Sequence, residues 1–347
     1  MKTKINASII GVSGYTGYEL IRILTNHPFT EIKYVCWSQD KTEKLENIFR
    51  GSTKVIDITC EKPNLEKIGK ESDVVFLAVP HLTAMEYVEK LYKYNCKIID
   101  LSADFRITNV DVYEYWYKEK HKCPELLTHA IYGLTELYRE KIKTAKLIAN
   151  PGCYPTCSIL GIAPLLKNSL VDGDIIIDAK SGVSGAGKKL TERVHFSETN
   201  ENFLAYSLQH RHQPEIAQEL NKLNYEPVNL TFIPHLVPMN RGMLCTIYLK
   251  SLKETSTNEL IELYKNFYKN DYFVRILPNG ILPETKFVKY SNFCDIGLYY
   301  DKHSETIIVI SCIDNICKGA SGEAVQNMNI MFNFAETSGL NFSGIYP

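Results

Sequence analysis

The chain has 347 residues, of which 45% are hydrophobic and 23% are charged, and its formal net charge is -1. These values are typical of a soluble globular protein of about two domains, long enough to bury a large core without disulfides or metals. A nearly neutral chain lacks the basic field on which binding to nucleic acid or anionic membranes usually depends, so we expect neither partner. The ten cysteines form no CxxC pair or zinc-finger pattern, so we expect reduced thiols and no metal site.

Two segments bear on the location of the protein. Residues 1–7 are polar and run directly into a strand-like segment, so we see no signal-peptide core. Residues 147–166 are uncharged and about as long as a membrane span. They contain Pro151, Pro155 and Pro164, a backbone that the hydrocarbon of a bilayer does not tolerate. We therefore expect a cytoplasmic protein.

The first part of the chain alternates strand-like with helix-like segments. Apolar runs predict strands at 8–12, 32–37, 73–79 and 97–101. Helical spacing of apolar residues follows the first of these runs at 20–24 and the third at 82–91. This alternation implies a parallel sheet with right-handed crossovers, and we expect an α/β domain over residues 1–150. The Tyr-rich, charged stretch 108–123 predicts a surface helix rather than core.

The pattern changes near residue 150. An uncharged helix at about 155–166 leads to a strand at 174–179 and a Gly-rich loop. Further long apolar runs follow at 231–236, 243–250, 293–300 and 306–312. Hairpin-like and helical pieces separate these runs, which predicts a mixed sheet in a second domain over residues 151–314. Apolar residues at helical spacing between Ala324 and Ala335 predict a last helix that needs a sheet or helix to cover it.

Three glycines stand between the first predicted strand and the first predicted helix. Gly11, Gly14 and Gly17 form G-x-x-G-x-x-G, a spacing variant of the dinucleotide fingerprint G-x-G-x-x-G. Glycines permit a tight turn and close backbone approach, and the helix N-terminus then meets a pyrophosphate. The alternative is a Gly-rich turn without a ligand. We favour dinucleotide binding, in which the intervening residues also take part: Ser13, Tyr15 and Thr16.

The end of the second predicted strand distinguishes NADP from NAD. Ser38, Lys41 and Lys44 suit a 2′-phosphate. Asp40 is the opposing feature, because it lies about 20 residues past the glycines, where a carboxylate would bind the ribose 2′-OH and repel a phosphate. We expect NADP(H) as the cofactor, with Ser38 among its ligands.

The sequence NPGCYPT, residues 150–156, places Cys153 at the start of the uncharged helix. Pro155 suits the first helical position. The helix dipole there stabilises a thiolate, which is the nucleophilic form of cysteine. A single cysteine is more often a small buried hydrophobe, but these neighbours favour a nucleophile. Cys157 lies one helical turn further along, and we expect it to pack in the core.

The sequence HRHQPEI, residues 210–216, precedes another predicted helix. If the segment is extended, His210 and His212 project on the same face, so one can act as acid/base while the other contacts substrate. The alternative is a helix-entry loop with exposed histidines. The separate candidate thiol favours catalysis, because Cys and His partners are commonly distant in sequence.

Further segments suit anion binding. The small residues of 181–189 follow a predicted strand, so their N–H groups can approach a cofactor or an oxyanion. Lys189 occupies the position where a Walker loop has Ser or Thr, which excludes that motif. Arg106 and Arg241 can each grip a carboxylate or phosphate, although a single arginine is by default a surface charge.

The motifs together resemble those of N-acetyl-gamma-glutamyl-phosphate reductases, the arginine-pathway family of the aspartate-semialdehyde dehydrogenase superfamily. They occur in family order from Gly11 to Asn329: GVSGYTGYEL, DLSADFR, NPGCYPT, KSGVSGAGK, HRHQPEI, FIPHLVPMNRGM and DNICKGASGEAVQNMN. The resemblance implies NADPH-dependent reduction of a small-molecule acyl phosphate, N-acetyl-L-glutamyl 5-phosphate, to the 5-semialdehyde. It also implies an N-terminal Rossmann domain, an α+β catalytic and oligomerisation domain in a homodimer or homotetramer, and a final segment, 315–347, whose helix returns to the first domain.

Site residues carry over from the family by motif. Cys153 is the nucleophile that forms a thioester, and His210 or His212 is the acid/base, with His210 favoured. Asn315, Ser184 and Gly185 match family positions beside the nicotinamide. Four further residues are expected to bind substrate: Arg106, Asn150, Lys188 and Arg241.

The chain departs from the family pattern at two positions. Thr135 replaces a proline common in a Tyr-Gly-Leu-Pro-Glu turn, and Gln39 replaces an arginine that commonly follows Ser38. The second change weakens the 2′-phosphate site. Two alternatives remain: a sister enzyme that acts on aspartyl phosphate or carrier-linked aminoadipyl phosphate, and a non-catalytic Rossmann protein that senses NADP.

Overall fold

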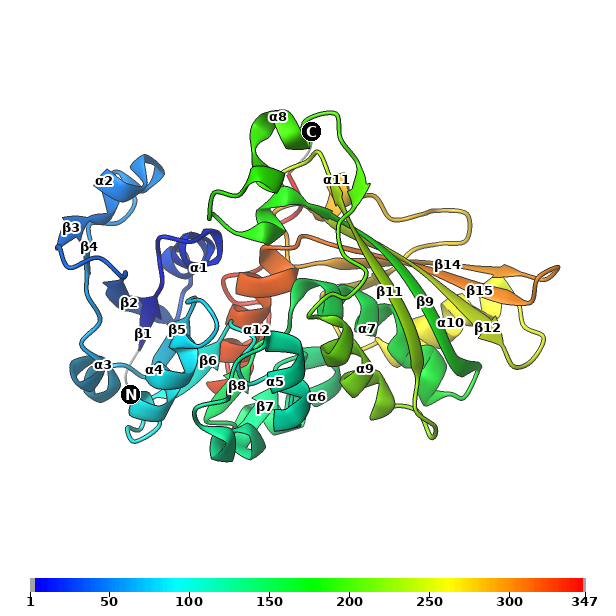
Figure 1. The fold of residues 1–347 in the computed structure, drawn as a ribbon, viewed down its shortest axis with the longest axis horizontal. Coiled ribbons are helices and arrows are strands. Elements are labelled where there is room, and N and C mark those ends of the chain that lie inside the picture. The colour runs from blue at the N-terminus through cyan, green and yellow to red at the C-terminus, as the bar shows by residue number, and fades with distance from the viewer. Residues whose placement is uncertain (1–3, 346–347) are drawn as a thin grey trace. The chain divides into compact units, whose positions relative to one another are not determined.

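The computed structural model describes residues 4–345, which form two compact units (Figure 1). Unit 1 contains the chain up to Pro151 together with Ala320–Asn341, and unit 2 contains Gly152–Gly319 together with the chain from Phe342. The predicted domain boundaries were 150 and 314. Residues 1–3 of the polar N-terminal segment and residues 346–347 lie outside the described part of the chain.

Unit 1 is built on an eight-stranded sheet with the order β3-β4-β2-β1-β5-β6-β8-β7. All neighbouring strands are parallel except β3 and β4. The strands are β1 (Ile5–Ile10), β2 (Thr30–Cys36), β3 (Glu43–Lys44), β4 (Thr59–Glu61), β5 (Val74–Leu77), β6 (Lys97–Asp100), β7 (Ala130–Tyr132) and β8 (Leu147–Ala149). This topology confirms the predicted Rossmann-like parallel sheet.

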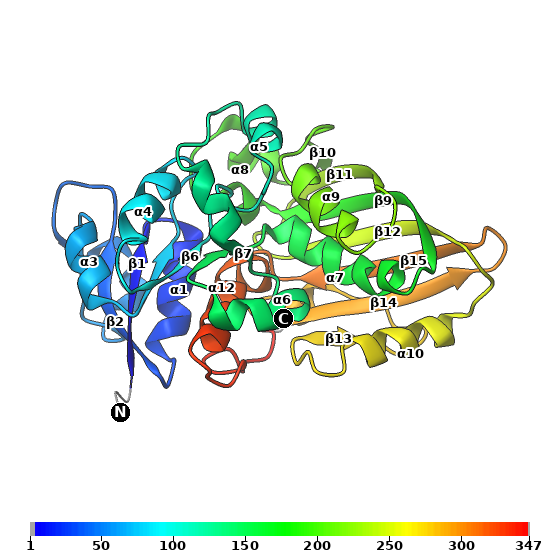
Figure 2. The same cartoon turned by 90° about the horizontal axis from the view of Figure 1, so that it is seen from below.

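The α-helices of unit 1 connect these strands or cover the sheet, and all but α2 are labelled in Figure 2. They are α1 (Tyr15–Thr25), α2 (Leu45–Ile48), α3 (Leu65–Glu71), α4 (Thr83–Leu91), α5 (Val110–Tyr117), α6 (Thr135–Thr144) and α12 (Gly322–Met331). The last of them, α12, packs against α1, α6 and β6. Every residue of α12 is buried, which supplies the cover that its apolar residues require, although the helix ends before Ala335.

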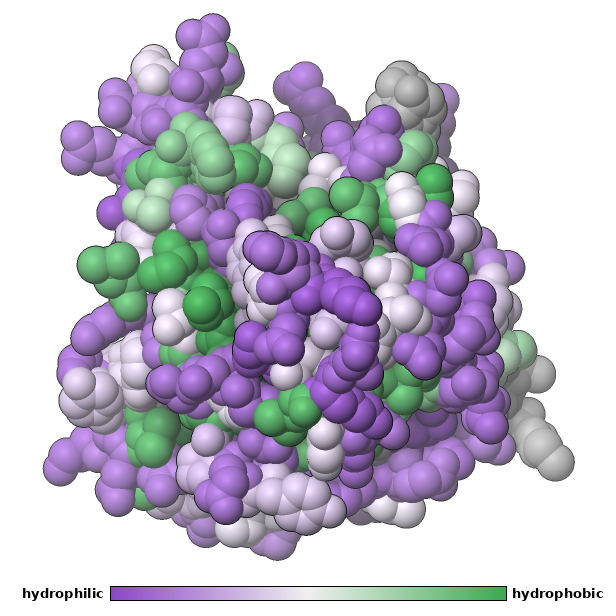
Figure 3. All heavy atoms as spheres, turned by 90° about the vertical axis from the view of Figure 1, so that its right-hand side faces the viewer, coloured by the Kyte–Doolittle hydropathy of each residue, from purple (hydrophilic) through white to green (hydrophobic). Residues whose placement is uncertain are grey.

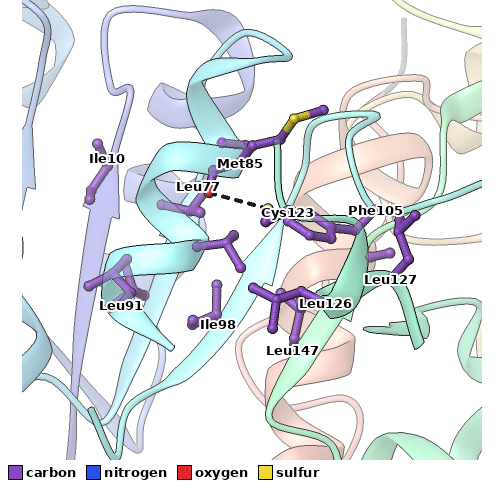
Figure 4. Packing of buried hydrophobic residues seen from close by; sticks show 14 of the residues in the cluster. Ile10, Leu77, Met85, Leu91, Ile98, Phe105, Cys123, Leu126, Leu127 and Leu147 are labelled. Atoms are coloured by element: carbon purple, nitrogen blue, oxygen red, sulfur yellow. Dashed lines mark hydrogen bonds between the residues drawn. The ribbon is translucent and has the colours of Figure 1, made fainter. Parts of the chain in front are cut away.

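One hydrophobic cluster of unit 1 lies between the sheet and the segments around α4 and α5 (Figure 4). Leu77 of β5 and Ile98 of β6 pack there with Met85 of α4. The prediction of a surface helix without core residues at 108–123 was wrong for Tyr113, which is fully buried. Its hydroxyl donates to the buried Asp104 carboxylate at 2.8 Å, so the ring enters the core with its polar tip satisfied.

Unit 2 contains a seven-stranded sheet with the order β10-β11-β9-β12-β15-β14-β13. The pairs β11–β9 and β13–β14 are parallel and the other pairs are antiparallel. The strands are β9 (Val171–Gly182), β10 (Leu204–Ala205), β11 (Asn229–Val237), β12 (Met243–Ser251), β13 (Val274–Ile276), β14 (Cys294–Asp301) and β15 (Thr306–Ile313). The predicted mixed sheet is confirmed.

Helix α7 (Cys153–Lys167) is the central helix of unit 2, and every residue from Tyr154 to Leu166 is buried. It packs on β9, β12 and β15 and against α9 (Gln213–Asn221) and α10 (Thr257–Phe267). Two shorter helices complete the unit, α8 (Phe196–Thr199) and α11 (Thr285–Val288). Cys157 is fully buried in this helix, as predicted. The packing of α7 on three strands and two helices therefore fixes the position of its first residue in the unit.

The surface is mixed in character. On the face shown in Figure 3, hydrophobic residues form separate patches among hydrophilic ones. Within residues 4–345, no helix combines the length and apolar character that crossing a bilayer requires.

Candidate active site

A cavity of about 760 Å³ opens in unit 2 beside the start of α7. Its walls include Cys153, His210 and His212, which the sequence analysis selected from two separate motifs. Several residues that the sequence analysis did not select also line it: Tyr154, Arg193, Tyr206 and Arg211. Unit 2 therefore brings the candidate nucleophile and both candidate acid/base residues to one cavity.

Cys153 is the first residue of α7, and Gly152 is its N-cap. The predicted first position of Pro155 was two residues late. The Gly152 carbonyl accepts the first intrahelical hydrogen bond, from the Thr156 N–H at 2.9 Å. The Gly152 N–H donates to Oε1 of Glu215 at 2.9 Å. Glu215 is fully buried in the first turn of α9, so this bond ties the starts of the two helices together.

Gly319 approaches the nucleophile closely. It lies in a π-helical turn, Cys317–Ser321, and π-helical turns occur frequently at functional sites. A Cβ on Gly319 would lie 2.7 Å from Cβ of Cys153 and 3.3 Å from the Asp314 carbonyl oxygen. Only glycine fits there without moving Cys153. This glycine is part of the DNICKGA motif, but no role was predicted for it from the sequence.

His210 is held by both ring nitrogens. Nδ1 accepts from the His212 N–H at 3.2 Å, and Nε2 lies 3.1 Å from the Tyr206 hydroxyl. Burial, with a smaller effect of the Arg211 charge, lowers the pKa of His210 to about 4. The segment is not extended as assumed, because His212 is the helical N-cap of α9, with φ −81° and ψ −14°. Both imidazoles still reach the cavity.

Tyr154 joins the two histidines. Its ring meets those of His210 and His212 edge to face, with centroids 5.5 Å and 5.9 Å away. Its hydroxyl donates to the His235 carbonyl at 3.4 Å and accepts from Tyr206 at 3.3 Å. Burial raises the pKa of both phenols, that of Tyr206 to about 12. The position of Tyr154 next to the cysteine in NPGCYPT was the sequence feature that could have indicated it.

The loop after β9 is more ordered than the sequence suggested. Ser181 and Gly182 belong to β9, and a 3₁₀ turn follows at Val183–Ala186. The N–H groups of residues 182, 183 and 184 donate to carbonyls of residues 242, 239 and 240. These three N–H groups therefore support the loop itself, as does the Gly187 N–H, which donates to the Ser184 carbonyl at 3.1 Å. The anion-binding prediction no longer includes any of these four N–H groups.

Asn315 lies beside this loop, as the motifs suggested. Its Nδ2 donates to the Ser184 hydroxyl at 3.0 Å, and its Oδ1 accepts from the Gly242 N–H at 2.8 Å. Gly185 lines the cavity, whereas Lys188 is exposed.

Arg241 supports the segment that carries Asn315. Its guanidinium pairs with the buried Asp314 carboxylate at 2.8 Å and lies over the Tyr290 ring at 4.3 Å. The same carboxylate accepts from the N–H groups of residues 316 and 317, both at 2.8 Å. The predicted contact of Arg241 with substrate stays a prediction.

Arg106 and Asn150 form a buried network in unit 1. Arg106 donates from Nε to the Asn150 carbonyl at 2.7 Å and from Nη2 to the Leu101 carbonyl at 2.8 Å. The Asn150 amide donates to the Ala320 carbonyl at 3.0 Å. These bonds join motifs that are distant in sequence, and the proposed role of the two residues in substrate binding stays a prediction.

The glycine turn of unit 1 fits a dinucleotide. Gly11 has φ +100°, and a Cβ there would overlap the Ala78 carbonyl oxygen. A Cβ on Gly17 would overlap the Gly11 carbonyl oxygen. Gly14 is the N-cap of α1 and provides no side-chain cap, so the helix start presents backbone N–H groups, with Ser13, Tyr15 and Thr16 around them. The tight glycine turn and the helix start that follows it suit a pyrophosphate.

The residues after β2 show how the Asp40 charge is offset. The Asp40 carboxylate accepts from Nζ of Lys62 at 2.5 Å, and both side chains are exposed. Lys41 lies over the Trp37 ring at 5.5 Å and 3.6 Å from the Glu43 carboxylate. Ser38 is exposed.

Within residues 4–345, no three His, Cys, Asp or Glu residues group closely enough to hold a metal ion.

Two family models match the chain. "Semialdehyde dehydrogenase, NAD binding domain" matches residues 6–145, and "Semialdehyde dehydrogenase, dimerisation domain" matches residues 153–315. Among solved structures, aspartate semialdehyde dehydrogenase II from Vibrio cholerae is similar, with a TM-score of 0.72 and 15% identity over 95% of this chain and 99% of that chain. Aspartate semialdehyde dehydrogenase with NADP from Candida albicans has a TM-score of 0.67 and 14% identity, over 95% of this chain and 98% of that chain. These structural likenesses show the fold.

Sequence relatives are much closer. N-acetyl-gamma-glutamyl-phosphate reductase from Acetivibrio thermocellus is 50% identical over 98% of this chain and 99% of its own length. The protein of that name from Caldicellulosiruptor saccharolyticus is also 50% identical, over 99% of each chain. Full-length similarity at this level, together with the Cys153 cavity and the glycine turn, shows that the chain belongs to the N-acetyl-gamma-glutamyl-phosphate reductase family of oxidoreductases.

Proposed function

We propose that the protein reduces N-acetyl-L-glutamyl 5-phosphate to N-acetyl-L-glutamate 5-semialdehyde and phosphate with NADPH, a step of arginine biosynthesis. The observation that carries the proposal is the position of Cys153 at the first residue of α7, in one cavity with His210 and His212. An acyl phosphate needs a strong nucleophile that can later leave, and a thiolate at a helix N-terminus meets that need. The names of the relatives supply the acyl group.

The chemistry then follows from the residues around Cys153. Its sulfur attacks the acyl carbon, a C–S bond forms, and the C–O bond to phosphate breaks, which leaves a thioester. Backbone N–H groups at the start of α7 are placed to stabilise the oxyanion. NADPH, when bound, supplies the hydride that reduces the thioester. An imidazole of the 210–212 segment takes the thiol proton and provides one when the C–S bond breaks.

We assign the cofactor to unit 1 and the chemistry to unit 2. The glycine turn at Gly11–Gly17 would hold the pyrophosphate, and Ser38 would meet the 2′-phosphate. Ser184, Gly185 and Asn315 would lie beside the nicotinamide. The predicted division into a cofactor domain at 1–150, a catalytic domain at 151–314 and a C-terminal segment at 315–347 remains our functional division of the chain. Because Cys153 must stay a reduced thiol, we place the enzyme in the cytoplasm.

A homo-oligomer is part of the proposal. One face of the unit 2 sheet packs on α7, and the side chains of Ile176, Tyr248 and Tyr299 point away from that face and are exposed. Tyr248 pairs in register with Ile176, and Tyr299 with Ile308, so these residues form one row across four strands. An apolar row of this kind suits a second copy of the chain. Replacing Tyr248 with glutamate and measuring the solution mass tests a dimer or tetramer built on this row.

The decisive experiment is the reverse reaction. Incubating the protein with N-acetylglutamate 5-semialdehyde, phosphate and NADP should produce NADPH absorbance. Turnover only with aspartate semialdehyde, or with a carrier-linked aminoadipate semialdehyde, would identify a sister enzyme. Binding of NADP(H) without turnover, together with an unreactive Cys153 in thiol labelling, would identify a non-catalytic sensor.

A further inference from the structure

We propose that Arg193 binds the carboxylate at the far end of the substrate, and that this contact selects the N-acetylglutamyl group. The inference rests on the proposed function, because it concerns the acyl group that the protein accepts. N-acetyl-L-glutamyl 5-phosphate reacts at its acyl carbon and carries an α-carboxylate beyond three further carbon atoms. The reaction leaves that carboxylate unchanged, so a residue that binds it contributes to substrate choice.

The position of Arg193 is fixed by its neighbours. It lies in a 3₁₀ turn, Glu192–Val194, on the wall of the cavity that contains Cys153. Its carbonyl accepts from the Thr199 hydroxyl at 3.2 Å, and its Nη1 donates to the Tyr206 carbonyl at 3.2 Å. A guanidinium has five N–H donors in a rigid fork, so four of them remain for a ligand.

The arginines that were expected to bind substrate already bind groups of the protein. Arg106 donates to the Asn150 carbonyl at 2.7 Å, and Arg241 pairs with the Asp314 carboxylate at 2.8 Å. Within residues 4–345, the guanidinium of Arg193 pairs with no carboxylate. A carboxylate that enters the cavity can therefore bind Arg193 without breaking an ion pair of the fold.

Tyr206 lies between Arg193 and the reacting end of the cavity. The guanidinium carbon is 5.8 Å from the centre of the Tyr206 ring, and the centres of the Tyr206 and His210 rings are 5.6 Å apart. The guanidinium and the imidazole are therefore no further apart than these two distances together.

The substrate has a matching length. In an extended N-acetylglutamyl group, four C–C bonds of about 1.5 Å place the carboxylate carbon about 5 Å from the acyl carbon. One hydrogen bond of about 3 Å at each end extends this span to about 11 Å. One substrate molecule can thus reach the histidine with its acyl group and Arg193 with its carboxylate.

The other charged residues of the cavity favour the same placement. Arg211 lies between the two histidines in the sequence, and its charge, after burial, is the second cause that lowers the pKa of His210. It therefore lies at the reacting end, where it suits the phosphate. Glu192 and Glu198 also line the cavity and repel a carboxylate that lies away from an arginine.

The test compares two aldehydes in the reverse reaction with phosphate and NADP. N-acetylglutamate 5-semialdehyde carries the carboxylate, and 4-acetamidobutanal is the same molecule with hydrogen in its place. Arg193→Gln should lower kcat/KM for the first aldehyde by about 10–100-fold, the usual effect of losing a hydrogen-bonded charge pair. It should leave kcat/KM for the second within about threefold of wild type. Arg193→Lys keeps the charge without the fork, so its loss with the first aldehyde should be smaller.

Arg211→Gln is the matched control, because it removes the same charge from the same cavity. It should lower kcat/KM for both aldehydes by the same factor, since both share the reacting end. If Arg193→Gln does not fold, as judged by thermal unfolding and NADP(H) binding, Arg193→Lys takes its place.

The same selection can be measured without turnover. N-acetylglutamate and 4-acetamidobutanoate are the unreactive acids that correspond to the two aldehydes. In calorimetric titrations the wild-type protein should bind N-acetylglutamate about 10–100-fold more tightly, and Arg193→Gln should remove most of this difference.

Three results would overturn the inference. They are an equal loss of kcat/KM with both aldehydes for Arg193→Gln, no loss with either, and a carboxylate-dependent loss that is larger for Arg211→Gln. Failure of the proposed function would look different, because the wild-type enzyme would then turn over neither aldehyde, whatever the titrations show for Arg193.

Discussion

Replacing Gly319 with alanine should slow the reaction much more than it weakens the fold. The new Cβ would lie 2.7 Å from Cβ of Cys153 and 3.2 Å from its Cα. Carbon atoms pack best at about 3.5–4.0 Å, so the two residues must separate by roughly 1 Å. Cys153 is the less restrained partner, because it is half-buried whereas Gly319 is buried. The displacement therefore falls on the nucleophile.

The size of the effect follows from this displacement. Misplacing a reacting group by about 1 Å can cost about 10²-fold in rate, so we expect kcat of Gly319→Ala to fall by about 10–100-fold. Overpacking typically costs about 1–3 kcal/mol of folding free energy. Steady-state kinetics and thermal unfolding of the same preparation measure both quantities.

Gly161→Ala is the matched control within the same helix. Its Cβ would lie 2.9 Å from Cδ1 of Ile247 and 3.3 Å from Cβ of Ser311, away from Cys153. It should lose comparable stability while kcat stays within about threefold of wild type, because the overlap is with core side chains. If Gly319→Ala keeps its kcat, or if both variants lose rate equally, the close approach of residue 319 does not set the position of the nucleophile.

Three further predictions concern the thiol, the cofactor and pH. Cys153→Ser should lower kcat by at least about 10³-fold in steady-state assays, whereas Cys157→Ser should stay within about tenfold, and a mild effect at 153 would exclude the covalent route. Because Lys62 offsets the Asp40 charge, kcat/KM with NADPH should exceed that with NADH by at least roughly tenfold, about 1.4 kcal/mol. Lys62→Ala should shrink this ratio, and a wild-type ratio near one would make Asp40 the ribose ligand. Because the pKa of His210 is lowered in the folded chain, the imidazole binds a proton between pH 6.5 and pH 4 in the unfolded chain but stays neutral in the folded chain. The free energy of unfolding should therefore keep its highest value above pH 6.5 and fall by at most about 3 kcal/mol as the pH is lowered to 4. Denaturant titrations should show a smaller fall for His210→Asn.

Regular elements were predictable wherever one periodicity ran long enough. The run 243–250 became β12 (Met243–Ser251), and the run 306–312 became β15 (Thr306–Ile313). Both are long antiparallel strands with clear alternation, so the pattern states which residues face the core. The position of Cys153 at the start of a helix was predictable for a similar reason, because a proline and an uncharged run mark a helix start.

Contacts between distant segments were not predictable in the same way. The Gly152 N–H finds its acceptor in Glu215, 63 residues further along, and no local pattern selects that partner. A nearer contact was missed as well: Tyr113 looked like a surface residue because the sequence does not show that Asp104 is buried where it can accept a hydrogen bond from the Tyr113 hydroxyl. The ion pair of Arg241 with Asp314 forms where β12 and β15, which are far apart in sequence, lie side by side, whereas the contact of Arg241 with substrate stays a prediction.

The roles of some glycines were predictable from the sequence, and the role of another is visible only in the structure. The sequence identified Gly11 and Gly17 by their spacing, and the structure adds that a Cβ at either one would meet backbone carbonyl oxygen, which cannot rotate away as a side chain can. Gly319 belongs to no spacing rule, yet it has the same kind of restriction beside the nucleophile. The restrictions act on different steps: the first two glycines shape the turn for a dinucleotide in unit 1, and the third sets the backbone of Cys153 in unit 2. Substitutions at Gly11 and Gly17 should therefore weaken cofactor affinity, whereas a substitution at Gly319 should slow the chemical step. Kinetic measurements can therefore distinguish the roles of these glycines.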